Sequence, residues 1–216
     1  MNDPWFSWQY LQQNSEAILA ATRQHVALTA WAVLIGLLIA MPLAVVARRY
    51  PRSQLPILGV TGAIYTIPSL ALFAALVPFT GLQPLTVEIG LVGYTLLILV
   101  RNVLTGLAEV PDEVREAARG MGYGSTRMLL QVELPLALPA IIAGLRVATV
   151  STIALVTVGA LVGYGGLGGL ILEGLNSLYR AEIVTAGVLC IALALLADGL
   201  LLGVQRLLTP WERGRA

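Results

Sequence analysis

The segment Glu116-Ala117-Ala118-Arg119-Gly120-Met121-Gly122, followed at 132–135 by Val-Glu-Leu-Pro, is a polar, glycine-rich stretch between long hydrophobic stretches. Of the 216 residues of the chain, 57% are hydrophobic and only 12% are charged, and the mean hydropathy is +0.83. A soluble domain needs roughly a quarter of its residues charged to coat its surface. The composition therefore predicts an all-α integral membrane protein in which the polar segment is a loop outside the bilayer.

Five stretches are apolar enough to cross a bilayer, whose hydrocarbon core takes about 20 residues of helix. They lie at 26–47, 55–77, 87–107, 139–161 and 183–202. The predicted transmembrane domain, 26–210, is expected between an external N-terminal segment at 1–25 and a cytoplasmic tail at 211–216. The first of these segments lacks the basic start and the small-residue cleavage site of a signal peptide, so the first span is expected to be kept.

The arginines predict the orientation, because basic residues of short loops are retained on the cytoplasmic side. With the N-terminus outside, the cytoplasmic arginines are Arg48, Arg49, Arg52, Arg101, Arg115, Arg119, Arg127, Arg206, Arg213 and Arg215. Only Arg23 and Arg180 face outside, and Arg146 lies in the fourth span. The chain is therefore predicted to run N-out and C-in, with the loop at about 108–138, between spans three and four, inside the cell.

The first half of this loop predicts a short helix beginning at Pro111, a residue that suits a first helical position. Asp112 and Glu116 complement the positive N-terminal end of this helix. They are also spaced to form i,i+3 ion pairs, with Arg115 and Arg119 respectively.

The second half of the loop predicts a sharp reversal of the chain at the glycines 120, 122 and 124. A second short helix is expected at 127–133, capped by Ser125 or Thr126 and interrupted by Pro135. These features by themselves also fit an amphipathic linker that lies on the membrane surface and binds no partner.

The order of residues in the loop favours a loop that contacts a partner protein over a simple surface linker. Glu-Ala-Ala, three residues, Gly, nine residues, an aliphatic residue, any residue and Leu-Pro resembles the loop motif of permease subunits in binding-protein-dependent ABC importers. The matching positions are Glu116, Ala117, Ala118, Gly122, Val132, Leu134 and Pro135. Further stretches, at 65–72, 101–104, 144–146 and 165–168, are similar to the branch that imports osmoprotectants such as glycine betaine, carnitine and choline. The resemblance covers about 25–210.

The resemblance implies a transport subunit that performs no covalent chemistry. Its loop would be a coupling helix seated in a groove of a separate cytoplasmic ATPase, and a substrate-binding protein would deliver the solute from outside. The chain has no lysine and so no phosphate-binding Gly-x-x-x-x-Gly-Lys-Ser/Thr loop. ATP is therefore expected on the partner, with no cofactor, metal or nucleic acid on this chain. A second permease copy or a paralogue is implied, in the cytoplasmic membrane.

Alternative functions remain open at this point. Permeases for methionine, taurine or sulfonates share the loop motif. From another class, Val162-Gly163-Tyr164-Gly165 overlaps the filter signature of potassium channels, although Leu161 stands where that filter has Thr. The overlapping Gly-x-Gly-x-x-Gly at 163–168 lacks the βαβ context of a dinucleotide site. The preferred interpretation is an outer turn or re-entrant segment in which glycines allow close backbone packing.

Polar residues within the spans give two further hypotheses. Tyr65, Thr66, Pro68 and Ser69 either mark a simple proline kink or line a translocation path with exposed backbone carbonyls. His25, the only histidine, borders the first span and is interpreted as an interfacial residue.

Arg146 and Asp198 are the two charges well inside the spans, each about 10–12 Å from the cytoplasmic boundary at 1.5 Å per residue. Unpaired charges are costly in the bilayer, so partners are expected. One hypothesis is a direct ion pair that joins spans four and five. The other is that Arg146 reaches the inner headgroups while Asp198 faces water in the translocation cavity.

Overall fold

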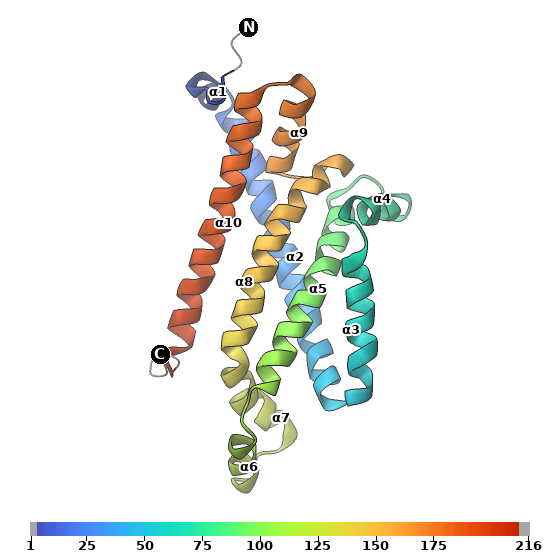
Figure 1. Ribbon diagram of the computed structural model, residues 1–216, viewed down its shortest axis with the longest axis vertical. Coiled ribbons are helices and arrows are strands. Elements are labelled where there is room, and N and C mark those ends of the chain that lie inside the picture. Colours follow the sequence, from blue (N-terminus) through green and yellow to red (C-terminus); the bar gives the residue numbers. More distant parts are fainter. Residues whose placement is uncertain (1–3, 212–216) are drawn as a thin grey trace.

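The computed structural model describes residues 4–211, and within this range the chain is helical with no β-strand (Figure 1). The helices are α1 (Trp8–Gln13), α2 (Ser15–Arg49), α3 (Pro51–Thr66), α4 (Ser69–Thr80), α5 (Pro84–Ala108), α6 (Asp112–Gly120), α7 (Ser125–Met128), the π-helical η1 (Leu129–Glu133), α8 (Leu134–Val158), the 3-10 turn η2 (Gly159–Val162), α9 (Leu167–Ser177) and α10 (Arg180–Leu208). All but the first residue of the predicted tail at 211–216 lies outside the described residues.

Four helical runs are long and apolar enough to cross a membrane. They are α2, α5, the continuous run Ser125–Val162, and α10. The pair α3 and α4 also passes this test, but the two helices are bent by 97° at the break between them. Residues 4–211 therefore contain four such spans, or five if the bent pair counts as one.

The expectation of one helical span at 55–77 is wrong in its geometry. Proline has no N–H to donate and disfavours helical backbone in the residue before it. Ile67, directly before Pro68, is accordingly extended, with φ −67° and ψ 130°. The chain leaves α3 at this point and turns across the end of the bundle as α4 (Figure 1). Pro68 breaks the helix instead of kinking it.

The centre of the bundle consists of α2, α5 and α8, packed through small residues. Ala40, Ala44 and Ala47 of α2 meet buried leucines and valines of α5. A Cβ added at Gly144 would lie 2.3 Å from the Cβ of Asn102, so α8 crosses α5 at close range here. Since a membrane offers no hydrophobic force between helices, such close van der Waals packing holds the bundle together.

Helices α6 and α7 extend beyond one end of the bundle, which we call the loop end; the corner between α2 and α3 lies at the same end (Figure 1). At the opposite end, α4 and α9 close over the spans. Phe73 of α4 is fully buried there, and a Cβ at Gly90 of α5 would lie 2.5 Å from its ring. This contact holds α4 against the start of α5.

The glycine segment after α8 is a tight turn, as the sequence predicts. Gly163 and Gly166 have φ of +95° and +53°, which favour glycine. A Cβ at Gly166 would lie 2.6 Å from the Cβ of His25, so α2 passes directly beside the turn. Val162-Gly163-Tyr164-Gly165 is therefore the end of a 3-10 turn and the reversal into α9, not an extended filter.

His25 corrects the sequence interpretation of an interfacial residue. Its side chain is fully buried in α2, and Nε2 lies 3.0 Å from the carbonyl oxygen of Ile153 on α8. The close approach of the glycine turn buries it, because Gly166 has no side chain to keep the two segments apart. His25 therefore joins α2 to α8 inside the bundle.

Candidate functional site

The candidate site is the projecting loop, in which α6 presents one polar face to solvent. Glu116 and Ala117 are exposed, whereas Arg115 and Ala118 are buried. Helix α6 begins at Asp112 with Pro111 as its N-cap, one residue later than the sequence predicts. An exposed carboxylate beside an exposed alanine gives a partner a small surface to approach and one acceptor to bind.

Arg115 connects this helix to both neighbouring spans. Its Nη2 donates to the carbonyl oxygen of Leu107 near the end of α5 at 2.6 Å, and its Nε donates to Oε1 of Glu133 before α8 at 2.8 Å. Nη1 donates to Oδ1 of Asp112 at 2.7 Å, which confirms the predicted i,i+3 pair. The residue is only 5% exposed, so one buried guanidinium fixes α6 to the ends of α5 and α8.

Opposing effects act on the pKa of Arg115. Burial acts to lower it, but the hydrogen bonds that Arg115 donates to Glu133 and Asp112 outweigh burial and raise the pKa above the ordinary arginine value. The guanidinium therefore stays charged. Charge-assisted hydrogen bonds of this kind are about twice as strong as neutral ones.

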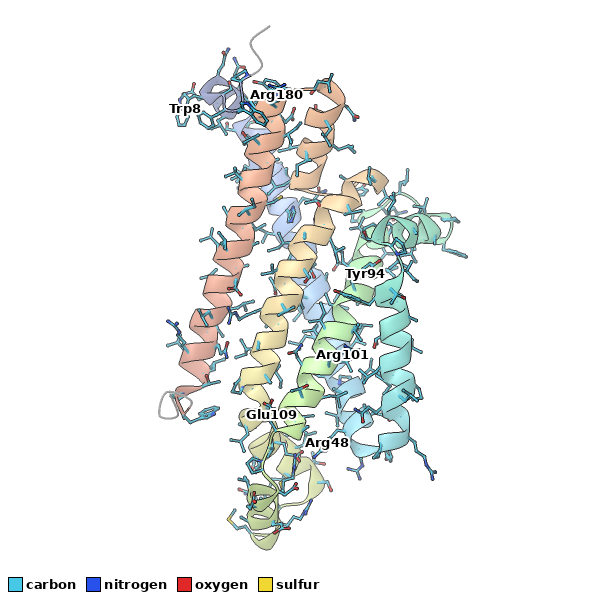
Figure 2. All side chains as sticks on the ribbon, viewed as in Figure 1. Trp8, Arg48, Tyr94, Arg101, Glu109 and Arg180 are labelled. Atoms are coloured by element: carbon cyan, nitrogen blue, oxygen red, sulfur yellow. The ribbon has the colours of Figure 1, made fainter. Side chains whose placement is uncertain are left out.

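The second predicted pair, Glu116 with Arg119, does not form: the two residues, both within the described range, share no ion pair. Arg119 instead lines a cavity of about 480 Å³ between the loop and α2, with Arg48 and Arg49 from the end of that helix. Arg48 marks this place in Figure 2. Three arginines and one glutamate, Glu133, thus line this cavity.

Gly122 reverses the chain after α6. Its φ is +81°, and the amides of Gly122 and Tyr123 donate to the carbonyls of Arg119 and Ala118 at 2.9 and 3.1 Å. This is the hydrogen-bond pattern of a Schellman C-cap, which places glycine in the left-handed conformation. Gly122 is therefore required by backbone geometry, because nothing lies within 4 Å of a Cβ added there.

The second half of the loop differs from the sequence prediction. Helix α7 begins at Ser125 with Gly124 as the N-cap, and neither Ser125 nor Thr126 caps it with its side chain. Pro135 does not interrupt the helix, because α7, η1 and α8 form one continuous run. For the same reason, the fourth span begins well before Pro139, where the sequence predicts its start. The π-helical turn directly before Leu134 absorbs the missing N–H and the bulk of the proline ring.

The motif residues at the start of α8 serve the packing of this run. Leu134 is half-buried against the core shared by α2, α5 and α8, whereas Pro135 is exposed. Glu133, between Val132 and Leu134 in the motif, is the acceptor for Arg115. Sequence reasoning missed this partner because Arg115 and Glu133 are 18 residues apart, although both flank motif positions.

The broken helix at Tyr65–Ser69 lies near the opposite end of the bundle. The hydroxyl of Tyr94 on α5 donates to the carbonyl oxygen of Ile67, which the break removes from the helix. The Tyr65 ring packs edge-on against Tyr94 with centroids 5.8 Å apart, and Thr66 Oγ1 donates to the Ala63 carbonyl at 2.8 Å. Sequence reasoning missed Tyr94, which satisfies the main free carbonyl of the bend (Figure 2).

Ser69 is the first residue of α4, and Pro68 before it is exposed. Tyr65 is 41% exposed, so this segment has a free surface. That surface carries aromatic and hydroxyl groups at the bend.

The structure brings Arg146 and Asp198 together. Nε and Nη2 of Arg146 donate to Oδ1 and Oδ2 of Asp198, each at 2.8 Å. This two-bond contact joins α8 to α10 beside a cavity of about 530 Å³ that Ser151 also lines. The side chains are 26% and 37% exposed, so the pair borders this cavity while remaining bonded.

Comparison with known families defines the class of protein that has this loop and this bundle. Residues 25–214 match the family described as the binding-protein-dependent transport system inner membrane component. The chain belongs to this family. It is a permease subunit of an ABC importer and a multi-pass protein of the inner membrane.

Named relatives align with more than nine tenths of the chain. It is 36% identical to the choline transport system permease protein OpuBB of Bacillus subtilis, over 94% of this chain and 93% of that protein. It is 37% identical to the glycine betaine/carnitine/choline transport system permease protein OpuCD of the same species, over 94% and 90%. The osmoprotectant import permease protein OsmW of Salmonella typhimurium is 36% identical, over 93% and 96%. The motifs at 65–72 and 144–146 resembled this branch.

Solved structures show the same fold at lower identity. A chain of the inward-facing MetNI methionine ABC transporter aligns with a TM-score of 0.80 and 22% identity, over 94% of this chain and 100% of that one. An amino acid ABC transporter with histidines aligns with a TM-score of 0.76 and 16% identity, over 93% and 98%. These likenesses support the permease fold alone.

Proposed function

We propose that this permease carries a quaternary-ammonium osmoprotectant, such as glycine betaine, carnitine or choline, into the cell. The observation that carries the proposal is the set of relatives named for these solutes, 36–37% identical over nine tenths of both chains. The methionine transporter shares the fold, but at 22% identity this likeness says nothing of substrate. A methionine-, taurine- or sulfonate-type permease is therefore the weaker alternative.

The proposal places the N-terminus outside and the loop end in the cytoplasm, with α3 and α4 together serving as one of five spans. Arg48 and Arg119 line the cavity at the loop end. Arg180 lies at the opposite end (Figure 2), and Arg23 belongs to the first third of α2, which begins at that end (Figure 1). Retention of arginine on the cytoplasmic side supports this orientation. The arginines at 213 and 215 lie outside the described residues.

In this orientation, α6 is the element that contacts a separate ATPase. Its exposed Glu116 and Ala117 meet the partner, while buried Arg115 fixes α6 to α5 and α8. A displacement of α6 would therefore move both spans together. ATP binding and hydrolysis belong to that partner, a substrate-binding protein delivers the solute outside, and a second permease copy or paralogue completes the path.

The path itself is proposed to include Tyr65, Thr66, Pro68 and Ser69 at the bend between α3 and α4. The Arg146–Asp198 pair, beside its own cavity, is proposed to hold α8 and α10 in register during the cycle. Both proposals rest on exposure of these groups at cavities or bends within the described bundle.

Uptake measurements test the substrate proposal. The permease is reconstituted in proteoliposomes with the ATPase and the substrate-binding protein of its own system, and uptake of radiolabelled choline, glycine betaine, methionine and taurine is compared. ATP-dependent uptake of choline or glycine betaine, competed by unlabelled carnitine, is expected. Uptake of methionine or taurine without uptake of either quaternary ammonium would reject the proposed substrate class.

A further inference from the structure

A recess between α2 and α5 near the opposite end of the bundle carries a carboxylate and an aromatic ring that the coupling loop does not explain. Its volume is about 410 Å³. Gln24, Leu28, Trp31 and Ile35 line it from α2 at intervals of three and four residues, which places them on one helix face. Glu88 faces them from α5, with Leu85 one turn before it. The recess is therefore largely apolar, and its polar groups are the carboxylate of Glu88 and the amide of Gln24.

Glu88 is held without a partner. Its Oε1 is buried and has no hydrogen-bond donor among residues 4–211, and none of the ion pairs in this range includes it. A buried polar atom without a hydrogen bond is unfavourable, so such atoms in native proteins call for an explanation. A bound cation beside Glu88 would provide one.

Trp31 supplies the second part of the recess. Trp31 is 59% exposed and lies near the start of the predicted span at 26–47, so its ring is accessible. Gln24, two turns earlier, is held in place because its Oε1 accepts the Gly166 amide at 2.9 Å. The recess is thus built on the rigid contact between α2 and the glycine turn.

The chemistry of the recess selects a soft organic cation. A tryptophan face attracts alkylammonium groups through the negative charge of its ring face, and a nearby carboxylate adds direct attraction. A hard metal ion needs several oxygen ligands, and residues 4–211 contain no group of three His, Cys, Asp or Glu side chains placed to hold one. An anion would be repelled by Glu88.

We propose that Glu88 and Trp31 form a binding site in the permease itself for the methylated ammonium group of the solute. The site rests on the proposed function and specifies it further. Because its only charged group is a carboxylate, it favours choline, which carries a single positive charge, over glycine betaine, whose own carboxylate would meet Glu88. The site would receive the solute near the external end of the path.

Direct binding to the permease–ATPase complex in nanodiscs, without the binding protein, tests the site. Radiolabelled choline is the ligand, and tetramethylammonium and glycine betaine are the competitors. Glu88→Gln is expected to weaken choline binding about tenfold, with a smaller change in competition by glycine betaine. Trp31→Leu is expected to weaken choline and tetramethylammonium alike, and Trp31→Phe to restore part of the affinity.

Matched controls separate the site from general damage. Glu173→Gln changes an exposed carboxylate on α9, and Trp8→Leu removes an exposed indole on α1. Both are expected to bind choline as the unmodified complex does. If Glu88→Gln fails to assemble, the Trp31→Leu and Trp31→Phe pair decides, since Trp31 is largely exposed.

Two failures are distinguishable. A complete system that imports no quaternary ammonium would reject the proposed function. A system that imports choline while Glu88→Gln and Trp31→Leu bind it as their controls do would overturn the site and leave the proposed function standing. If Glu88→Gln weakens the binding of choline and of glycine betaine equally, the site is also overturned, because the carboxylate would then not distinguish the two solutes by their charge.

Discussion

Arg146 of α8 and Asp198 of α10 are joined by two parallel hydrogen bonds of 2.8 Å. Helix α10 has no buried residue in its most apolar stretch, and its main contacts within the described bundle are with α8 and α9. The pair is one of these contacts, and it lies beside a cavity between the same two helices. Its two-bond geometry fixes the rotation of α10 as well as its distance from α8.

A double-mutant cycle tests this pair. Arg146→Gln and Asp198→Asn are each expected to lower the Tm of the purified permease complex, because each leaves one charge unpaired near the membrane interior. The double variant is expected to lose less than the sum of the two losses. Additive losses in both Tm and uptake would show that the two side chains act independently.

Arg115→Gln is expected to uncouple the loop from the spans. It removes the ion pair with Glu133 and leaves the Leu107 carbonyl without its donor, at a cost on the order of 1–3 kcal/mol. The measurement is solute-stimulated ATPase activity against the amount of assembled complex, with Arg127→Gln, an exposed arginine of the same loop, as the control. Full stimulation in Arg115→Gln would exclude the proposed linkage.

The contribution of Arg115 is expected to be independent of pH in the physiological range. Its pKa in the folded protein is raised, so its stabilising charge is present at all pH values below the ordinary arginine pKa and is lost only as pH rises through the folded value. The difference in ATPase stimulation between Arg115→Gln and the unmodified chain should therefore stay constant from about pH 6 to 9. A difference that changes within this range would assign the effect to another group.

Gly122→Val is expected to destabilise the reversal after α6, because a side chain in the left-handed region costs about 1–2 kcal/mol. Gly120→Ala is the matched control: it lies in helical backbone, and an added Cβ at either position meets nothing within 4 Å. Co-purification of the ATPase and uptake are measured together. Equal behaviour of the two variants would mean that the conformation of Gly122 does not matter for docking.

Glu116→Lys is expected to weaken association with the ATPase while leaving the permease in the membrane, since a reversed charge meets a site that accepts an anion. A reduction of about tenfold or more is expected for a charge reversal at a docking surface. Glu113→Lys, exposed on the same helix, is the control. If both variants weaken binding to the ATPase equally, the effect reflects the overall charge of the loop and not a specific contact of Glu116. If neither variant weakens binding, Glu116 is not part of the docking surface.

Cysteine labelling tests the orientation. In a Cys190→Ser background, Ser125→Cys at the loop end is expected to react with a membrane-impermeant maleimide only after permeabilisation. Gln83→Cys, exposed at the start of α5, is expected to react in intact cells. The reverse pattern would place the loop outside the cell and remove the basis for contact with an ATPase.

Much of this protein followed from local composition. The apolar stretches located α2, α5, α8 and α10 because a bilayer selects helices by length and hydrophobicity. Gly122 and Asp112–Arg115 followed from neighbouring residues alone, since a reversal and an i,i+3 pair are local geometry. The sequence also led to the hypothesis of an Arg146–Asp198 pair, because charges in apolar spans need partners.

The tertiary structure alone decided what depends on residues far apart in the chain. The link from Arg115 to Glu133 and Leu107 exists because α5, α6 and the run into α8 meet at one point, which no spacing rule specifies. Pro68 breaks its helix whereas Pro135 is absorbed by a π-helical turn, and the difference lies in the surrounding packing. Tyr94 caps the bend from another helix, and Gly166 lets a turn bury His25. The sequence by itself determined the all-helical class and the positions of α2, α5, α8 and α10, because these depend on local composition; the bend between α3 and α4, helix α9 and the contacts among the helices depended on packing between residues distant in the chain.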